Sequence, residues 1–243
     1  FAQENFEGHG GRLAVEVLRR HDVDVIFTLS GGHLFVLYDG CVQADLPLVD
    51  VRHEQTATFA AEGWAKVTRR PGCAALTAGP GITNGVSAMT SAWMNGSPIV
   101  VLGGRAPQLR WGAGSLQELD HVPIVAPIVR RAATATGPES IVAELHASLL
   151  ESRTPHRGPT FVDIPLDAFG PASVALPAVD AAALRGASPD PGSLDQVAKL
   201  VDAAERPVLI AGGDVFWAEA EKAMVAWAEA AGVPVFVNGM GRG

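Results

Sequence analysis

The sequence has few cysteines, an excess of acidic over basic residues and no long hydrophobic run. Its two cysteines, Cys41 and Cys73, are too few for a disulfide framework or a zinc cage, which favours a reducing compartment. Because 18 Lys and Arg stand against 26 Asp and Glu, the net charge is −8, which argues against a nucleic-acid partner. No apolar run reaches the ~18 residues of a membrane span, and residues 1–10 lack a secretory pattern. We therefore expect a cytoplasmic protein with no membrane partner.

Several catalytic motifs are also missing. The sequence has no Gly-x-Ser-x-Gly elbow, no His-Glu-x-x-His and no Cys-x-x-Cys, so neither a serine hydrolase nor a zinc enzyme is indicated. We predict no metal ligands in this chain.

Hydrophobic residues are abundant. They make up 48% of the sequence, against only 18% charged residues, a composition that is typical of a globular chain with a large core.

Short apolar strands alternate with helical stretches along the first two thirds of the chain. The predicted strands are 23–29, 47–51, 73–78, 98–103 and 160–164, and the predicted helices are 12–20, 34–43, 54–69, 82–95 and 138–151. This alternation predicts an α/β fold of three layers, a parallel sheet with helices on both faces. Such folds bind ligands beyond the carboxyl ends of their strands, here at the segments that begin with Ser30, Val51, Ala78 and Gly103.

A change in composition divides the chain. Residues 171–193 are rich in Pro, Ala, Gly, Ser and Asp, and we interpret them as a linker between a first domain, 1–170, and the start of a second, 194–243. The second domain is predicted to hold helices at 194–204 and 217–231 and strands at 207–211 and 233–237. Because two helices and two strands are too few for a covered sheet, we expect a Rossmann-like unit truncated within a longer protein.

Three of the strand ends carry residues suited to chemistry. Glu54 begins an alanine-rich helix, where desolvation would favour the neutral form of its carboxyl group. An acid in the first turn also stabilises a helix, so a structural role is the alternative. The turn 79–81, Gly-Pro-Gly, would let a ligand approach the backbone, or it would simply join a strand to a helix. His33 follows the first strand, where it would serve as a proton relay or as a structural histidine.

Together these segments resemble one enzyme family. The motifs that carry the resemblance are Ile-Phe-Thr-Leu-Ser-Gly-Gly-His, Arg-His-Glu-Gln-Thr-Ala-x-Phe-Ala-Ala-Glu-Gly, Thr-Ala-Gly-Pro-Gly-Ile-Thr-Asn-Gly, Ser-Pro-Ile-Val-Val-Leu-Gly-Gly, Leu-Gln-Glu-Leu-Asp and Arg-Gly-Pro-x-Phe-Val-Asp-Ile-Pro. Over residues 11–170 they resemble the thiamine-diphosphate (ThDP) enzymes of the acetolactate synthase and benzaldehyde lyase group. The resemblance implies a pyrimidine-binding domain with the ThDP-binding fold, followed by the beginning of a central domain.

The resemblance also implies roles for individual residues. Glu54 matches the glutamate that bonds N1′ of the aminopyrimidine and activates the cofactor. Pro80 and Asn84 match the turn beside that ring, and Gly31 and Gly32 match a loop that lines it. Two further residues match catalytic positions of the family, Gln117 near the thiazolium and substrate and His33 as a proton relay.

Two departures from the family pattern bear on the cofactors. Flavin-binding acetolactate synthases carry an arginine before Pro-Gly-Pro, whereas this chain has His156-Arg157-Gly158-Pro159, so FAD lacks support. The family holds the diphosphate and Mg²⁺ through Gly-Asp-Gly and a later asparagine, and Gly213-Asp214-Val215 is not that motif. We therefore expect the Mg²⁺ site outside this chain, the chain alone to be inactive, and the full protein to be a homodimer or homotetramer with its active site between subunits.

The function implied by the resemblance is decarboxylation of a 2-keto acid such as pyruvate and transfer of the carbon unit to a second carbonyl, within branched-chain amino-acid biosynthesis or a paralogous pathway. His33 favours an alternative, a ThDP-dependent lyase of 2-hydroxy ketones or 2-hydroxyacyl-CoA. The alternative from another class is a catalytically incomplete module for ThDP binding or assembly.

Overall fold

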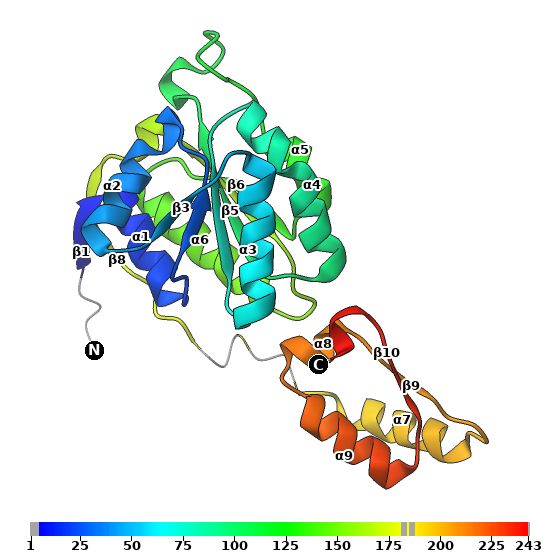
Figure 1. Ribbon diagram of the computed structural model, residues 1–243. Helices are drawn as coiled ribbons and strands as arrows, with labels where there is room; N and C mark the ends of the chain where they lie inside the picture. The colour runs from blue at the N-terminus through cyan, green and yellow to red at the C-terminus, as the bar shows by residue number, and fades with distance from the viewer. Residues whose placement is uncertain (1–4, 181–183, 185–187, 243) are drawn as a thin grey trace. The chain divides into compact units, whose positions relative to one another are not determined.

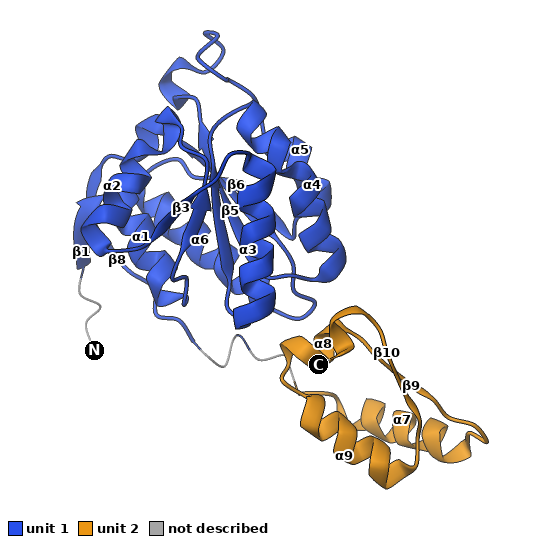
Figure 2. Cartoon of the chain, viewed as in Figure 1, with its two compact units in different colours: residues 1–184 blue, residues 185–243 orange. Residues whose placement is uncertain are grey.

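The computed structural model describes residues 5–180, 184 and 188–242, and the chain forms two compact units (Figures 1 and 2). Unit 1 is Phe1–Leu184 and unit 2 is Arg185–Gly243. No helix in the described ranges has the length and apolar character needed to cross a bilayer.

A six-stranded parallel sheet forms the centre of unit 1. Its order is β3-β2-β4-β5-β7-β6. The strands are β2 (Ile26–Thr28), β3 (Leu48–Asp50), β4 (Gly72–Leu76), β5 (Ile99–Arg105), β6 (Arg131–Thr134) and β7 (Thr160–Pro165). Buried on both faces, β4, β5 and β7 are near-continuous apolar runs, as expected for central parallel strands. The predicted fold class is confirmed.

Helices cover both faces of this sheet (Figure 1). On one face α1 (Gly10–Arg20) packs against α2 (Phe35–Ala44) and α6 (Pro138–Arg153), and their apolar residues join one core cluster with the sheet. On the other face α3 (Glu54–Thr68) packs against α4 (Pro80–Asn95) and against β4. The remaining helical turns are α5 (Val122–Val125), η1 (Gly32–Leu34), η2 (Gln108–Arg110), η3 (Ala126–Ile128) and η4 (Leu166–Ala168).

A separate two-stranded ribbon was not predicted from the sequence. Strands β1 (Asn5–His9) and β8 (Pro171–Ala175) pair in antiparallel register, with Asn5 opposite Ala175. The start of the predicted linker at 171 is therefore wrong, because residues 171–175 are held by hydrogen bonds within unit 1. The end of that linker also differs, since the next helix begins at Pro191.

Unit 2 contains the two helices and two strands predicted for it, together with two short helices that were not predicted. It comprises α7 (Pro191–Ala203), β9 (Leu209–Ala211), α8 (Gly213–Trp217), α9 (Glu221–Ala231), β10 (Val235–Val237) and η5 (Gly239–Arg242), with β9 and β10 parallel. The predicted helix 217–231 starts four residues later, as α9. Between α8 and α9, Glu219 has a φ of 54°, a left-handed conformation that a continuous helix excludes.

Candidate active site

The carboxyl ends of the unit 1 strands form the candidate site. The order β3-β2-β4 means that the chain leaves β2 in one direction across the sheet, to β3, and then returns past it to β4. This reversal makes a crevice between the ends of β2 and β4, the usual ligand position in open α/β sheets. His33 follows β2, Glu54 follows β3 and Gly79 follows β4. Three predicted site segments therefore meet at one edge of the sheet.

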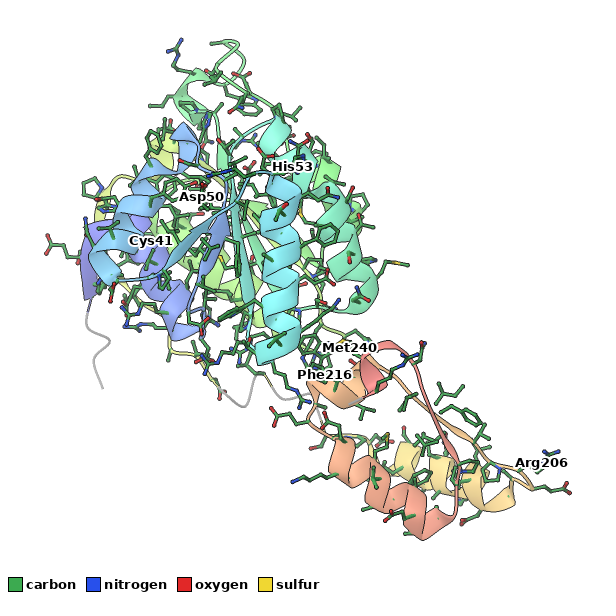
Figure 3. All side chains as sticks on the ribbon, in the orientation of Figure 1. Cys41, Asp50, His53, Arg206, Phe216 and Met240 are labelled. Atoms are coloured by element: carbon green, nitrogen blue, oxygen red, sulfur yellow. The ribbon has the colours of Figure 1, made fainter. Side chains whose placement is uncertain are left out.

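Glu54 opens α3 and is linked to α4 by a hydrogen bond. His53, labelled in Figure 3, caps the helix because its Nδ1 accepts the amide of Gln55 over 3.1 Å. The Glu54 side chain is 9% exposed, and its Oε2 accepts from Asn84 Nδ2 over 3.0 Å. Its Oε1 makes no hydrogen bond within the described part of the chain, so this oxygen is available to a ligand.

A space for a ligand lies over the first turn of α4. A Cβ placed on Gly81 would stand 3.6 Å from Glu54 Oε1 and 2.9 Å from Thr77 Cγ2. Glycine thus leaves room that any other residue would fill, directly beside the carboxyl group. Pro80, at the start of the same turn, is exposed.

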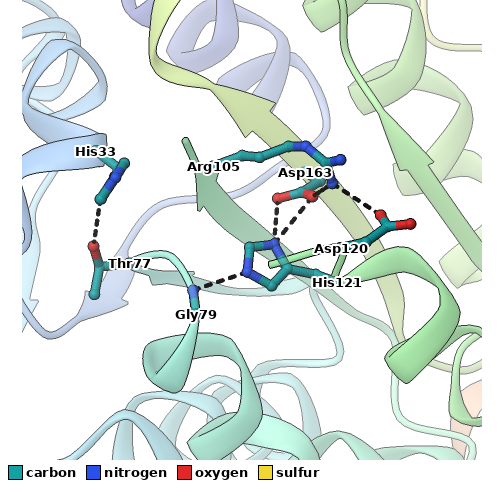
Figure 4. A network of polar contacts seen from close by, with 7 residues as sticks. All are labelled: His33, Thr77, Gly79, Arg105, Asp120, His121 and Asp163. Carbon is teal, nitrogen blue, oxygen red and sulfur yellow. Dashed lines mark hydrogen bonds and ion pairs between the residues drawn. The ribbon is translucent and has the colours of Figure 1, made fainter. Parts of the chain in front are cut away.

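His33 is buried beside the turn after β4. It is 6% exposed, and its Nδ1 lies 3.2 Å from Thr77 Oγ1 (Figure 4). Burial lowers the pKa of His33 from 6.5, an effect that a hydrogen bond to the Leu116 backbone opposes in part. His33 is therefore neutral at neutral pH and able to accept a proton. The preceding glycines, Gly31 and Gly32, form the beginning of η1 that carries it.

The loop between β5 and α5 brings Gln117 to the same place. Gln117 is half-buried, has a φ of 56°, and its Cβ would stand 3.0 Å from a Cβ on Gly79. Glu118 shapes this loop, since its carboxylate accepts the amides of Gly112 at 2.8 Å and Ser115 at 3.1 Å. The backbone of Gln117 thus packs on the turn that begins α4.

A pocket of about 440 Å³ opens beside His33. Its lining is mostly apolar with one cation, and comprises Gly32, His33, Pro107, Arg110, Gly114, Ser115, Leu116 and Leu166. Arg110 belongs to η2, which is fixed because the Asp167 carboxylate accepts the amides of Gln108 at 2.9 Å and Leu109 at 3.0 Å. A pocket with this lining suits a small organic acid.

One set of residues at this edge was not predicted from the sequence. His121 lies fully buried with its Nδ1 3.0 Å from Asp163 Oδ1 and its Nε2 2.8 Å from the amide of Gly79 (Figure 4). Arg105 donates to Asp163 over 2.6 Å and to Asp120 over 3.1 Å, and its guanidinium lies 3.9 Å from the ring centre of Trp111. The polar Asp163 within a buried strand was the sequence signal that could have indicated it.

Other groups give no sign of metal or thiol chemistry. Within the described ranges, no three His, Cys, Asp or Glu side chains gather as metal ligands. Burial raises the pKa of the Cys41 thiol to about 12, which leaves it protonated and unreactive. Burial also raises the pKa of Cys73.

Comparison with known proteins follows the division into two units. Residues 8–124 match the family model for the thiamine pyrophosphate enzyme N-terminal TPP-binding domain, and residues 194–243 match the model for the central domain of the same enzymes. The acetolactate synthase large subunit IlvG of Mycobacterium tuberculosis is 52% identical over 244 residues, covering 97% of this chain and 43% of that protein. The 2-hydroxyacyl-CoA lyase 2 of Caenorhabditis elegans is 32% identical over 276 residues, covering 99% of this chain and 43% of that protein.

A solved structure shares the fold. The thiamine diphosphate-dependent 4-hydroxybenzoylformate decarboxylase of Rhodococcus jostii aligns with a TM-score of 0.82 at 23% identity, over 95% of this chain and 44% of that one. The chain thus spans less than half the length of the relatives it matches.

Proposed function

Because the chain belongs to the thiamine pyrophosphate enzyme family, we propose that the full protein decarboxylates a 2-keto acid and transfers the carbon unit to a second carbonyl, as in acetolactate synthesis. The observation that carries the proposal is the bond between Glu54 and Asn84 beside the space over Gly81. The 52% identity to an acetolactate synthase large subunit supports the choice of reaction.

The residues at the crevice fit ThDP. Glu54 presents a free carboxyl oxygen, Gly81 leaves room for a flat ring, and Asn84 fixes the carboxyl group from the side. In our proposal these residues and Pro80 hold the aminopyrimidine, with Glu54 sharing a proton at Oε1 with the ring nitrogen N1′. When bound, ThDP supplies an electron sink for the carbanion that decarboxylation leaves. Gly31 and Gly32 line the same ring.

The pocket beside His33 is the proposed substrate position. Arg110 supplies a positive charge for a carboxylate, and the apolar wall suits a short alkyl group. His33, which is neutral, accepts or returns a proton at its imidazole ring, and Gln117 contacts the substrate from the loop above Gly79.

His33 also favours the second candidate, a lyase of 2-hydroxy ketones or 2-hydroxyacyl-CoA. Such an enzyme must remove the hydroxyl proton of its substrate before the carbon–carbon bond breaks, and a buried neutral histidine is suited to that step. The 32% identity to 2-hydroxyacyl-CoA lyase 2 is compatible with this reaction.

A non-catalytic ThDP-binding module is disfavoured because Glu54, Asn84 and Gln117 are all present and gathered.

The remaining parts of the proposal follow from family membership. We propose that Mg²⁺ and the diphosphate are bound by residues outside this chain, and that the full protein is a homo-oligomer whose active site lies between subunits. We also propose a cytoplasmic location and a role in branched-chain amino-acid biosynthesis or a paralogous pathway.

The test measures CO₂ release from pyruvate by the full-length protein with ThDP and Mg²⁺. Release that is absent from a Glu54→Gln variant would support the synthase, and analysis of the carbon products would identify the acceptor. Cleavage of 2-hydroxyacyl-CoA or benzoin without turnover of pyruvate would support the lyase instead. Binding of ThDP with neither activity would leave the non-catalytic module.

A further inference from the structure

His121 connects three segments that are distant in sequence. It precedes α5, while Asp163 lies near the end of β7 and Gly79 precedes α4. Both ring nitrogens are engaged, Nδ1 with both carboxylate oxygens of Asp163, at 3.0 and 3.1 Å, and Nε2 with the amide of Gly79 at 2.8 Å. The side chains of His121 and Asp163 are completely buried. Burial shields these bonds from bulk solvent.

The neighbours of His121 select one tautomer. The carboxylate of Asp163 also accepts from Arg105, whose guanidinium lies 2.6 Å from Oδ2. A backbone amide can only donate, so Nε2 of His121 must accept from Gly79 and the proton of the neutral ring lies on Nδ1. Nε2 is then the unprotonated nitrogen and accepts the amide of Gly79. The contacts with Asp163, which Arg105 also binds, therefore orient the ring of His121 with Nε2 towards the turn.

The buried amide of Gly79 depends on His121 for a hydrogen-bond acceptor. It is the residue before α4, with φ 59° and ψ −116°, and as a glycine it has no side chain that could cap the helix. Its carbonyl accepts the amides of Ile82 and Thr83, whereas its own amide points at His121. A buried amide without a partner is unfavourable, because it loses its hydrogen bond to water and gains none in the protein. His121 thus fixes a backbone conformation that would otherwise be costly.

We propose that His121 is a positioning residue for the aminopyrimidine site. By holding the amide of Gly79 it fixes the turn 79–81 and the direction of the first turns of α4, from which Asn84 reaches Glu54. This inference rests on the proposed function, since it assigns His121 to the binding of ThDP. It acts through the backbone and touches neither cofactor nor substrate.

The experiment compares His121→Leu with His121→Gln in the full-length protein. Glutamine places an oxygen and an N–H group about as far apart as the two ring nitrogens, so it can accept from Gly79 and donate to Asp163, whereas leucine can do neither. We measure the Kd of ThDP by titration calorimetry with Mg²⁺ present, and deuterium exchange in the peptide spanning 77–85. We expect His121→Leu to raise the Kd at least tenfold and to speed exchange in that peptide. His121→Gln should stay within threefold of the wild type.

A control separates positioning from a loss of overall stability. Leu145→Ala removes a fully buried side chain of α6, on the opposite face of the sheet, and should lower the melting temperature without changing the Kd of ThDP. If His121→Leu does not fold, His121→Asn, which is too short to reach both partners, takes its place under the same criterion.

The outcomes distinguish this inference from the proposed function. A folded His121→Leu or His121→Asn variant with wild-type affinity for ThDP would overturn the role of His121 and leave the proposed function intact. Failure of His121→Gln to restore the affinity would also overturn it. A wild-type protein that binds no ThDP would overturn the proposed function, and this inference with it.

Discussion

Asn84 donates a hydrogen bond of 3.0 Å to Glu54 and so joins the beginnings of α4 and α3. The bond occupies one carboxyl oxygen of Glu54 and leaves the other facing the space over Gly81. A carboxyl group held in this way has a fixed direction before any ligand arrives. Preorganisation of this kind is what a proton-sharing group requires.

Glu54→Gln should therefore abolish turnover with little effect on folding. Glutamine keeps the size of the side chain but has no carboxyl proton to share, and loss of an acid–base group typically lowers rates by about 10²–10⁴-fold. The measurement is CO₂ release or lyase turnover by the full-length protein, alongside its melting temperature. A variant that keeps most of its turnover would contradict the role assigned to Glu54.

Glu62→Gln, two helical turns along α3, is the matched control. Glu62 is 3% exposed and its carboxylate accepts from Ser91 and Asn95, at 2.9 Å each. Burial alone would raise the pKa of Glu62, but hydrogen bonds led by that of Lys66 outweigh burial and lower it. Its stabilising effect is therefore present above the ordinary carboxyl range and lost as pH falls through its folded pKa. We expect this variant to lose about 1–3 kcal/mol of stability at neutral pH and to keep its catalytic rate.

Gly79→Ala should destabilise the protein, and Gly63→Ala should not. The backbone of Gly79 has a φ of 59°, and an added Cβ would lie 3.0 Å from the carbonyl oxygen of Gln117, so the cost should be about 1–3 kcal/mol. Gly63 lies within α3, is exposed, and has nothing within 4 Å of an added Cβ. Alanine there should stabilise the helix by about 0.5–1 kcal/mol. Urea unfolding of both variants checks the pair, and equal effects would refute the explanation.

Arg110→Gln should raise the KM for a 2-keto acid by roughly tenfold or more, because one charge-assisted pair with a carboxylate is lost. Since our proposal places Arg110 at the substrate carboxylate and not at the reacting carbon, kcat should change much less. Arg110→Lys should recover part of the loss. Steady-state kinetics with pyruvate give the comparison, and an unchanged KM in Arg110→Gln would remove Arg110 from the substrate pocket.

The pair His21 and His146 should make unit 1 sensitive to acid. Nε2 of His21 lies 2.9 Å from Nδ1 of His146. Burial, and after it the electrostatic effect of His146 and Arg153, lowers the pKa of His21 from 6.5 to about 4. Below pH 6.5 His21 is protonated in the unfolded state but stays neutral in the folded state. The free energy of unfolding therefore falls as pH drops from 6.5 towards 4. After allowance for solvent screening the loss is on the order of 1–2 kcal/mol.

His21→Gln, which cannot titrate, tests this. Its free energy of unfolding should fall less steeply between pH 6.5 and pH 4 than that of the wild type, as followed by urea denaturation. Parallel curves for the two proteins would show that the histidine pair is not the cause.

The sequence predicted the central sheet because burial on both faces leaves an apolar run that can be read locally. Four strands of the six, β2, β4, β5 and β7, were recognised in this way. The edge strand β3 is largely exposed and was recognised from its short apolar stretch at Leu48 and Val49. The sixth, β6, is the other edge strand, Arg-Ala-Ala-Thr, which is half-exposed and has no large apolar residue, so it has no such signal. The ribbon of β1 and β8 was missed for a related reason. Each strand has few apolar residues and depends on a partner more than 160 positions away.

The site divides in the same way. Glu54, Asn84 and His33 stand at strand ends or in helices that the pattern identifies, and the structure places them where the order of elements requires. His121 has no such pattern, because its role depends on Asp163 and on the amide of Gly79. The role of a residue whose partners lie in two other segments can be recognised only from the folded structure.

The ribbon of β1 and β8 also affects the order of events during synthesis. Asn5 leaves the ribosome long before its partner in the ribbon, Ala175. Strand β1 therefore stays unpaired until all six strands of the parallel sheet have been synthesised. Contacts between such distant positions form slowly, so closing the ribbon is the natural last step in folding of unit 1. Until then the nascent chain exposes a strand edge that chaperones can bind.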